Sequence, residues 1–242
     1  MEKTIYSQRS GNFLSKEAMH VRQYALTNDI KCVTFNHVDE LSTEEIQESY
    51  LIEGSVETIQ MALRRIGKTA PEPDYYPEIL QHTDFMNRRV WKSTLEELEK
   101  HHFTQPIFIK SHEWKKITGI VIMPNQRDSF ESFDKNTKIW CGDMINIIAE
   151  WRVYVHHDRI VAVGRYDENP NNDLKLDFNV INKAIDLMKN KRVSYAFDWG
   201  LTEFGTTELI ENNDAWAIGA YDGIDYKQYT HFLIDRWNEL TK

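Results

Sequence analysis

The chain has 242 residues, of which 41% are hydrophobic and 12% aromatic, so it carries enough apolar bulk to fold around a sizeable core. Its 29 Lys and Arg residues against 38 Asp and Glu residues give a net charge of −9, which disfavours a nucleic-acid partner because phosphate backbones attract clustered cations. Its apolar runs are far shorter than the roughly 20 residues that a membrane span needs. The chain also starts without an apolar signal segment, so we expect no membrane partner and a cytoplasmic location.

The first third of the chain predicts a small α/β layer. Short elements alternate there, over residues 15–28 (helix), 31–35 (strand), 49–52 (strand) and 54–66 (helix). Residues 67–81 then contain three prolines, which forbid a helix and favour an extended connector. We therefore predict one domain over residues 1–84, with its connector, and a second over residues 85–242.

The second domain reads as a helix over residues 84–100 followed by strands. The predicted strands cover 107–110, 119–123, 138–140, 146–155, 159–166, 193–198 and 206–211, and a second helix covers 178–190. Several strands are separated by gaps of turn length, which predicts antiparallel hairpins and an α+β fold class.

A first hairpin carries two arginines. If His157-Asp158 is the whole loop, Glu150 lies opposite Arg165, and Arg152 lies one diagonal position away from Arg165 on the same face. Two guanidinium groups held side by side suit a polyphosphate or carboxylate ligand, because arginine offers planar bidentate donors. A solvent-exposed ladder of Glu-Arg pairs is the alternative.

A second hairpin places oxygen ligands close together. Asp198 ends an apolar strand, while Glu211 and Asn213, two residues apart on the next strand, point to one face. Such ligands suit magnesium. The alternatives are a turn residue for Asp198 and a strand-end cap for the Glu-x-Asn pair. Lys110 ends another apolar strand before a polar, basic loop, where it either reaches a phosphate or remains a solvated strand end.

Several familiar sites are absent from the sequence, including a Walker A loop, a GxGxxG motif, a GxSxG elbow and an HExxH helix. The doublets His101-His102 and His156-His157 lack the i, i+4 partner of a zinc helix, so we expect no histidine metal site. Cys32 and Cys141 lie in no CxxC pair and are expected to be buried thiols. The stretch Trp216 to Tyr221 is interpreted as packing.

The order of these segments resembles the ATP-grasp superfamily, and within it the bacterial and phage clade named for two arginines and one lysine. The segments that carry the resemblance in the first part are Gly54-Ser55-Val56, Ala62-Leu63, Asp74-Tyr75-Tyr76-Pro77 and Arg88 to Leu95. Those in the second part are Phe108-Ile109-Lys110, Lys116-Ile117-Thr118-Gly119, Glu150 to Val155, Gly164-Arg165-Tyr166, Phe197-Asp198-Trp199-Gly200 and Leu209 to Asp214. The resemblance implies an α+β ATP-grasp fold preceded by a small α/β pre-ATP-grasp domain.

The resemblance also implies the residues of a nucleotide site. Lys110 would contact the ATP phosphates, and Lys116 and Gly119 would belong to the flexible loop over them. Arg152 and Arg165 would be the two catalytic arginines, and Asp198, Glu211 and Asn213 would hold Mg²⁺. The adenine would lie under the strand with Trp140, Cys141 and Asp143, whose backbone groups would read the base, with Asp143 in place of the usual hinge glutamate.

The implied reaction is ATP-dependent ligation through an acyl phosphate, which an amine or thiol then attacks. The substrates would be a small-molecule or peptide carboxylate and an amine, whose identity the sequence does not reveal, nor does it reveal the oligomeric state. Two alternatives remain open, namely a small-molecule kinase of the same fold and a non-catalytic ATP-binding regulatory protein.

Overall fold

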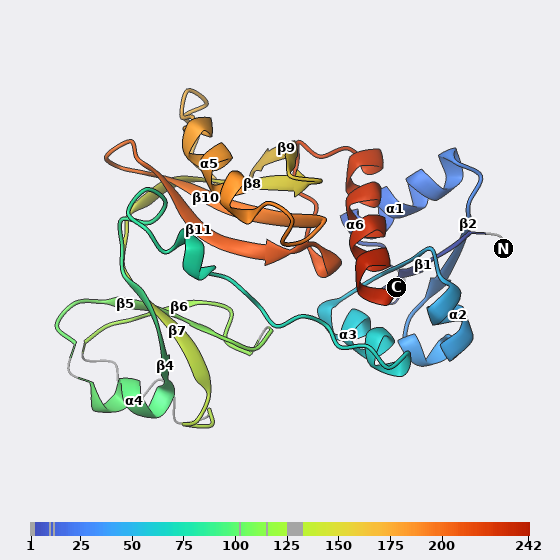
Figure 1. Cartoon of the computed structure of the whole chain (residues 1–242), viewed down its shortest axis with the longest axis horizontal. Coiled ribbons are helices and arrows are strands. Elements are labelled where there is room, and N and C mark those ends of the chain that lie inside the picture. Colours follow the sequence, from blue (N-terminus) through green and yellow to red (C-terminus); the bar gives the residue numbers. More distant parts are fainter. Residues whose placement is uncertain (1–2, 10, 12, 102, 115, 125–132) are drawn as a thin grey trace.

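The computed structural model describes residues 3–9, 11, 13–101, 103–114, 116–124 and 133–242 (Figure 1). His102 and Lys115 lie outside these residues. The strands of the described residues form three sheets, one parallel and two antiparallel, together with helices, which confirms the α+β class. None of the helices in this part of the chain has the length and apolar character that crossing a bilayer requires.

The first third folds into a three-stranded parallel sheet. Its elements are β1 Thr4–Gln8, α1 Lys16–Thr27, β2 Lys31–Phe35, η1 Val38–Glu40, α2 Thr43–Glu48, β3 Leu51–Glu53 and α3 Val56–Arg65. The strand order is β2-β1-β3, with Ile5 of the central strand paired to Cys32 and Leu51. The predicted helices and strands are confirmed to within a few residues, whereas β1 and α2 have no counterpart among them.

Serine caps explain where the helices of this layer begin. The hydroxyls of Ser15, Ser42 and Ser55 each accept a backbone N–H from the first turn of the helix that follows. Because all three strands run parallel, their carboxyl ends and the capped start of α3 meet at one edge of the sheet. Ligands bind at this edge in open α/β sheets.

The C-terminal helix α6, Tyr226–Thr241, packs on this first layer and is absent from the predicted elements. Phe232 and Trp237 of α6 are buried in the same hydrophobic cluster as Ile5 of β1. Figure 1 shows α6 beside α1. Residues from both ends of the chain therefore build the core around the first sheet. The domain boundary near residue 84 stays a prediction.

The second sheet is antiparallel, in the order β4-β7-β5-β6. Its elements, after the short helix η2 Glu78–Leu80, are β4 Val90–Thr94, α4 Leu95–Lys100, β5 Ile107–Ser111, β6 Ile120–Ile122 and β7 Lys138–Asp143. Leu95 and Leu98 of α4 pack against Ile109 and Ile139 of the sheet, and all four side chains are buried.

The prediction of one helix over residues 84–100 is wrong. Residues 90–94 form strand β4, and only the last six residues are helical. Val90, Trp91 and Thr94 favour a strand, because β-branched and aromatic side chains pack well on a pleated surface. Thr94 then starts the helix, since its hydroxyl accepts the Glu97 N–H while the Glu97 carboxylate accepts the Thr94 N–H.

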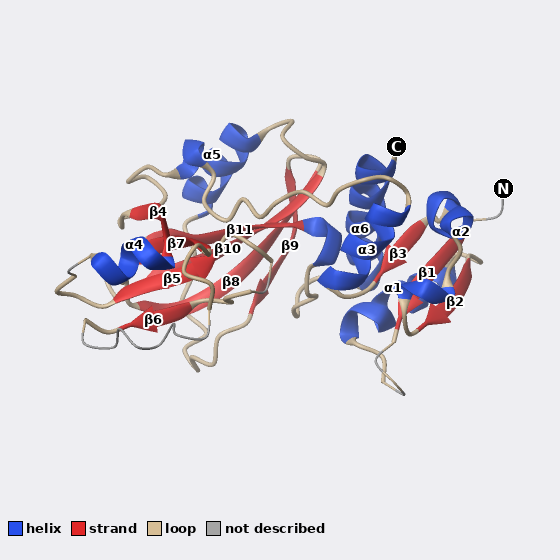
Figure 2. Cartoon of the chain, turned by 90° about the horizontal axis from the view of Figure 1, so that it is seen from below, coloured by secondary structure: helices blue, strands red, loops and turns tan. Residues whose placement is uncertain are grey.

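The third sheet is also antiparallel, in the order β11-β10-β8-β9. Its elements are β8 Ile147–His156, β9 Arg159–Arg165, α5 Phe178–Met188, β10 Ser194–Thr202 and β11 Thr207–Asp214, followed by the short helix η4 Ala215–Ala217. Helix α5 covers one face of this sheet (Figure 2), where Ile181 and Ile185 share a core with Val153 and Phe197. Side chains alternate along strands, so residues next to these point to the opposite face.

The β8–β9 hairpin turns through residues 157–158, as predicted, but its pairing shifts along the strands. A bulge after the first pairs leaves one residue of β9 without a partner on β8. Past the bulge, Arg152 pairs with Gly164 and Arg165 pairs with Trp151, each one position from the predicted register. Because a shift of one residue reverses the face of every side chain, the two arginines lie on opposite faces. The prediction that they share a face is wrong.

Candidate active site

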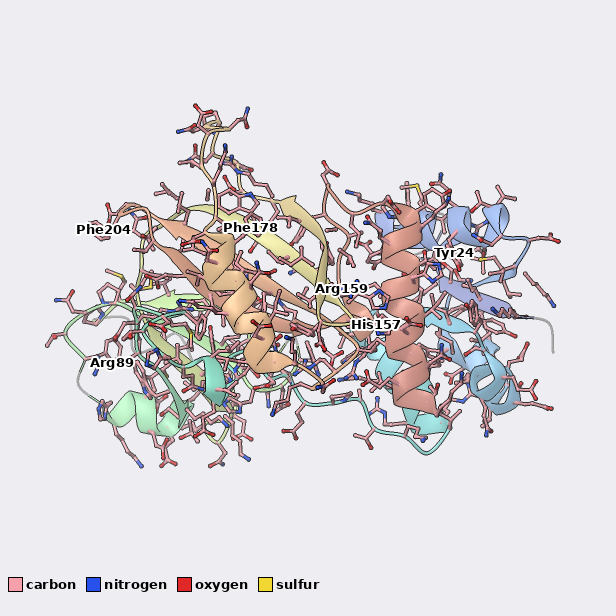
Figure 3. All side chains as sticks on the ribbon, turned by 45° about the horizontal axis from the view of Figure 1, so that its top comes forward. Tyr24, Arg89, His157, Arg159, Phe178 and Phe204 are labelled. Atoms are coloured by element: carbon pink, nitrogen blue, oxygen red, sulfur yellow. The ribbon has the colours of Figure 1, made fainter. Side chains whose placement is uncertain are left out.

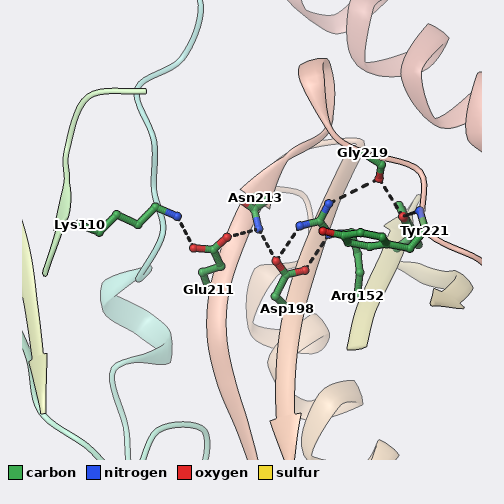
Figure 4. A network of polar contacts seen from close by, with 8 residues as sticks. Lys110, Arg152, Asp198, Glu211, Asn213, Gly219 and Tyr221 are labelled. Carbon is green, nitrogen blue, oxygen red and sulfur yellow. Dashed lines mark hydrogen bonds and ion pairs between the residues drawn. The ribbon is translucent and has the colours of Figure 1, made fainter. Parts of the chain in front are cut away.

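Asp198, Glu211 and Asn213 lie together on the face of the third sheet that α5 leaves uncovered, as the second hairpin predicts. Asp198 of β10 pairs with Glu211 of β11. The Nδ2 atom of Asn213 donates to Asp198 Oδ2 at 3.1 Å and to Glu211 Oε1 at 3.0 Å (Figure 4). Two carboxylates and a side-chain amide within this distance form the oxygen-rich ligand set that magnesium takes, so the residues present fit this ion.

Arg152 and Asp198 form a buried bidentate ion pair. The Nε and Nη2 atoms of Arg152 donate to the two carboxylate oxygens of Asp198, both at 2.7 Å. Burial raises the pKa of Asp198 to about 6, although the guanidinium acts in the opposite direction. Burial also disfavours the charged guanidinium, but the Asp198 carboxylate outweighs it and raises the pKa of Arg152. The arginine therefore stays charged and fixed in orientation.

Lys110 of β5 reaches across from the second sheet to the third. Its Nζ atom forms an ion pair with Glu211 Oε2 (Figure 4). The same atom lies 3.7 Å from the centre of the Tyr75 ring. The Lys110 side chain is 11% exposed. Burial alone would raise the pKa of Glu211, but the ammonium group of Lys110 holds it below its ordinary value. The structure thus joins the predicted phosphate lysine to the predicted metal ligands.

Three residues that the sequence analysis did not identify complete this network. The Gly219 carbonyl accepts the Tyr154 hydroxyl at 2.9 Å and lies 3.5 Å from Arg152 Nη1. The Tyr221 N–H donates to the Tyr154 hydroxyl at 2.9 Å, and its ring centre lies 4.6 Å from the Arg152 guanidinium carbon. Tyr154 was detectable, because it stands two residues after Arg152 on the same strand face. Nothing in the sequence indicates Gly219 or Tyr221.

The segment from Trp216 to Tyr221, interpreted as packing, contributes both to the core and to the network around Arg152. Trp216 is buried in the core cluster around α6, as that interpretation expects. The segment can also approach the sheet closely, because Gly164 has no side chain. A Cβ atom there would lie 2.4 Å from the Asp222 carbonyl oxygen. The glycine opposite Arg152 therefore allows Tyr221 to lie over the arginine.

Lys116 and Gly119 lie in the connection between β5 and β6. Lys116 Nζ forms an ion pair with Glu113 at 3.1 Å, so the structure does not bring it to the Asp198 cluster. Gly119 has φ of 120°, and a Cβ atom there would lie 2.9 Å from the Phe108 ring, so only glycine fits. Their contact with a nucleotide stays a prediction.

Trp140, Cys141 and Asp143 belong to β7, which lies inside the second sheet. Trp140 and Cys141 pair with β5 on one side and with β4 on the other, so their backbone groups are used by the sheet. Their contact with the adenine stays a prediction. Asp143 accepts two hydrogen bonds from the Arg89 guanidinium, both at 2.9 Å. Its role as a hinge residue stays a prediction.

Arg165 lies apart from the Asp198 cluster. Its guanidinium donates to both oxygens of Asp167, at 2.8 and 2.9 Å, and to the carbonyls of Asn169 and Asn171. It also lies 5.2 Å from the centre of the Trp151 ring. These contacts hold the loop that follows β9. A catalytic role for Arg165 stays a prediction from the resemblance.

A cavity of about 660 Å³ adjoins the network at the carboxyl edge of the first sheet. Gly219 lines it together with Glu17 and Glu53. Glu53 is 7% exposed and accepts the Ser7 hydroxyl at 2.8 Å, and burial raises its pKa to about 7. Because Gly219 also touches Arg152, the cavity and the Asp198 cluster are neighbours.

The chain is similar in fold to solved ATP-grasp enzymes. The D-alanine–D-alanine ligase of Bacillus anthracis aligns with a TM-score of 0.57 and 13% identity over 99% of this chain and 97% of that chain. N5-carboxyaminoimidazole synthetase of Staphylococcus aureus aligns with a TM-score of 0.60 and 10% identity over 98% of this chain and 78% of that chain. The ATP-grasp ligase PsnB, complexed with a phosphomimetic variant of minimal precursor, Mg and ADP, aligns with a TM-score of 0.56 and 11% identity over 100% of this chain and 98% of that chain. At such identities the likeness establishes the fold alone.

No curated protein matches the chain. Residues 85–232, which carry both antiparallel sheets and the Asp198 cluster, match the ATP-grasp domain of family 2 in the clade named for two arginines and one lysine. This match covers more than half of the chain. The protein therefore belongs to this two-arginine, one-lysine clade of ATP-grasp proteins.

Proposed function

We propose that this protein is an ATP-dependent ligase that joins a carboxylate to an amine or thiol through an acyl phosphate, with Mg²⁺. The observation that carries the proposal is the convergence of Asp198, Glu211 and Asn213 with two basic side chains, Lys110 and Arg152, on one sheet face. Binding of adenine alone needs no such oxygen ligands. A polyphosphate with its metal ion needs both the acidic and the basic groups.

The roles of these residues follow from the charge of the reactants. A carboxylate that attacks the γ-phosphate brings an anion to a polyanion, so the main requirement is electrostatic. Bound Mg²⁺ would neutralise charge on the phosphate oxygens. Lys110 would leave Glu211 to contact a phosphate, and Arg152, oriented by Asp198, would hold the anionic substrate. Lys116, Gly119 and the end of β7 would lie around the remainder of the nucleotide.

The cavity beside Gly219 is the proposed site of the acceptor. Glu17 and Glu53 line it together with Arg9, and the two carboxylates suit a substrate with an ammonium group. An amine must lose a proton before it attacks an acyl phosphate, and a carboxylate with a pKa near 7 can accept one. Glu53 would therefore bind the acceptor and take its proton. Because Glu53 lies at the end of β3, the first sheet would then contribute a residue to the site.

A product assay tests the proposal. Purified protein with magnesium and ATP is screened against amino acids and peptides for ADP release that depends on an acceptor amine, and products are identified by mass spectrometry. We expect a product whose mass is that of both substrates less one water, and loss of the reaction in Glu211→Gln. Glu96→Gln, which removes an exposed partner of Lys100, is the matched control and should keep the reaction.

The same assay separates the alternatives. ADP release with a stable phosphate ester, formed without an amine, would contradict ligation and indicate a kinase. Magnesium-dependent ATP binding with no product from any acceptor would indicate a non-catalytic nucleotide-binding protein.

A further inference from the structure

A second group of polar side chains converges away from the proposed active site, where the β8–β9 hairpin meets α6. The Nε2 atoms of His156 and His157 lie 2.8 and 3.1 Å from the same oxygen of Asp235, its Oδ2 atom. All three ligand atoms lie within 4.8 Å of one another. Figure 3 shows His157 beside the C-terminal helix, close to Arg159 on the same hairpin.

The hairpin turn explains how two neighbouring histidines reach one carboxylate. Adjacent side chains on a regular strand point to opposite faces. His157 and Asp158 form the two-residue turn with φ of 49° and 56°, and this left-handed conformation breaks the alternation directly after His156. His157 therefore turns toward the same helix as His156. The partner that the doublet lacks in the sequence comes from Asp235, 78 residues later.

The arrangement matches the first three ligands of a zinc site. With metal–ligand distances of about 2.0 to 2.1 Å, tetrahedral geometry separates neighbouring ligand atoms by about 3.3 Å. The two observed separations from Asp235 are only slightly shorter, so small outward movements would admit an ion.

The exposure of the three side chains leaves room for a fourth ligand. His156 is 14% exposed and Asp235 35%, whereas His157 is 66% exposed. Water can therefore reach the site from the His157 side. His231, one helical turn before Asp235, does not supply the fourth ligand, because its Nε2 atom contacts the Tyr24 hydroxyl at 3.3 Å.

We propose that His156, His157 and Asp235 bind a zinc ion, with water as the fourth ligand. Two imidazoles and one carboxylate suit zinc better than magnesium, which prefers oxygen ligands alone. The ion would tie the tip of the β8–β9 hairpin to α6, and so to the first layer of the fold. Since β8 also carries Arg152, the site would hold that strand in place from its far end. The proposal does not depend on the proposed ligase reaction.

Calorimetric titration of the metal-free full chain with zinc chloride tests the proposal, with magnesium in excess to occupy sites made of oxygen ligands. We expect one equivalent of zinc to bind and to raise the melting temperature. His157→Asn and Asp235→Asn should each lose this binding and the thermal shift. Asparagine is chosen at position 157 because it tolerates the left-handed backbone, and the residue is exposed, so the variant should fold.

His82→Asn is the matched control, because its side chain is also 66% exposed and lies outside the cluster. It should bind zinc like the wild type. Cobalt offers an independent readout, since an ion bound in a tetrahedral site shows visible absorption bands that both variants should lack. Equal zinc affinity in wild type and variants, or no zinc binding by the wild type, would overturn the proposal and leave a hydrogen-bonded cluster.

Discussion

Asp198 on β10 receives both of its principal hydrogen bonds from one side chain, the guanidinium of Arg152 on the neighbouring strand. Both residues are buried, at 3% and 8% exposure. The pair orients the arginine and offsets the charge of the acid, but it also occupies the carboxylate that we assign to magnesium. Stability and metal binding therefore depend on the same two side chains.

We predict that Asp198→Asn lowers the free energy of unfolding of the ligand-free protein by about 3 to 5 kcal/mol, because it leaves a buried guanidinium without its counter-ion. The double variant Asp198→Asn/Arg152→Gln should recover much of this loss. Urea denaturation of the four proteins in the cycle measures the coupling. As a control, Arg89→Gln removes a pair whose arginine is 82% exposed and should cost at most about 1 kcal/mol. Additive effects at Asp198 and Arg152 would refute the pairing.

Glu211→Gln should abolish the stabilisation by magnesium and ATP. The substitution keeps the size of the side chain, but its single amide oxygen can accept from Lys110 or from Asn213 and not from both. We expect a lower melting temperature of the ligand-free protein, because Lys110 loses its counter-ion, and no increase on adding magnesium and ATP, since ligands stabilise only the state that binds them. Thermal melts with magnesium alone, ATP alone and both provide the comparison. A full shift in the variant would exclude Glu211 as a metal ligand.

Arg165→Lys tests whether this arginine acts in catalysis or in the loop. A lysine cannot replace the bidentate contact with Asp167 together with the bonds to two carbonyl groups. From its position we expect a lower melting temperature, with turnover per folded molecule close to that of the wild type. Arg152→Lys should instead reduce turnover strongly. If Arg165→Lys loses turnover with an unchanged melting temperature, the catalytic role implied by the family resemblance is supported instead.

Glu53→Gln should change how stability depends on pH. The pKa of Glu53 is about 7 in the folded protein against an ordinary 4.5, so the folded state keeps a proton that the unfolded chain loses between these values. Stability from this group therefore falls as the pH rises from about 4.5 to about 7. The variant cannot ionise and should be more stable at pH 8 by up to about 3 kcal/mol, with little difference near pH 4.

Denaturation curves across this pH range give the comparison, with the exposed Glu44→Gln as control. A parallel pH dependence in the wild type and Glu53→Gln would show that Glu53 is not the group responsible. In an active preparation, Glu53→Gln should also raise the KM for the amine while leaving the affinity for magnesium and ATP unchanged.

Local sequence patterns were sufficient for most of the strands and for the acidic side of the site. The alternation of apolar and polar residues located the strands of the third sheet, and two hairpin strands with oxygen ligands two residues apart predicted the cluster of Asp198, Glu211 and Asn213. These features depend on the period of a strand, which each segment carries by itself.

The register of the β8–β9 hairpin depended on a bulge within the strands as well as on the turn. Residues 157–158 were correctly read as the loop, yet a bulge farther along reversed the face of Arg165 relative to Arg152. A bulge forms where the packing of the whole sheet favours an extra residue, and the alternating pattern of β9 contains no sign of it. Strand β4 was mistaken for helix because the apolar spacing of Trp91, Leu95 and Leu98 also fits a helical period.

Contacts between distant segments were decided only by the tertiary structure. Helix α6 completes the core of the first layer from the other end of the chain, and its Asp235 meets His156 and His157. Tyr221 covers Arg152 because Gly164 leaves space for the backbone that carries it. The sequence by itself determined which residues share a face within a regular, correctly located strand. The folded chain alone determined which faces meet, because such contacts depend on the packing of elements far apart in the sequence, and local periodicity carries no information about it.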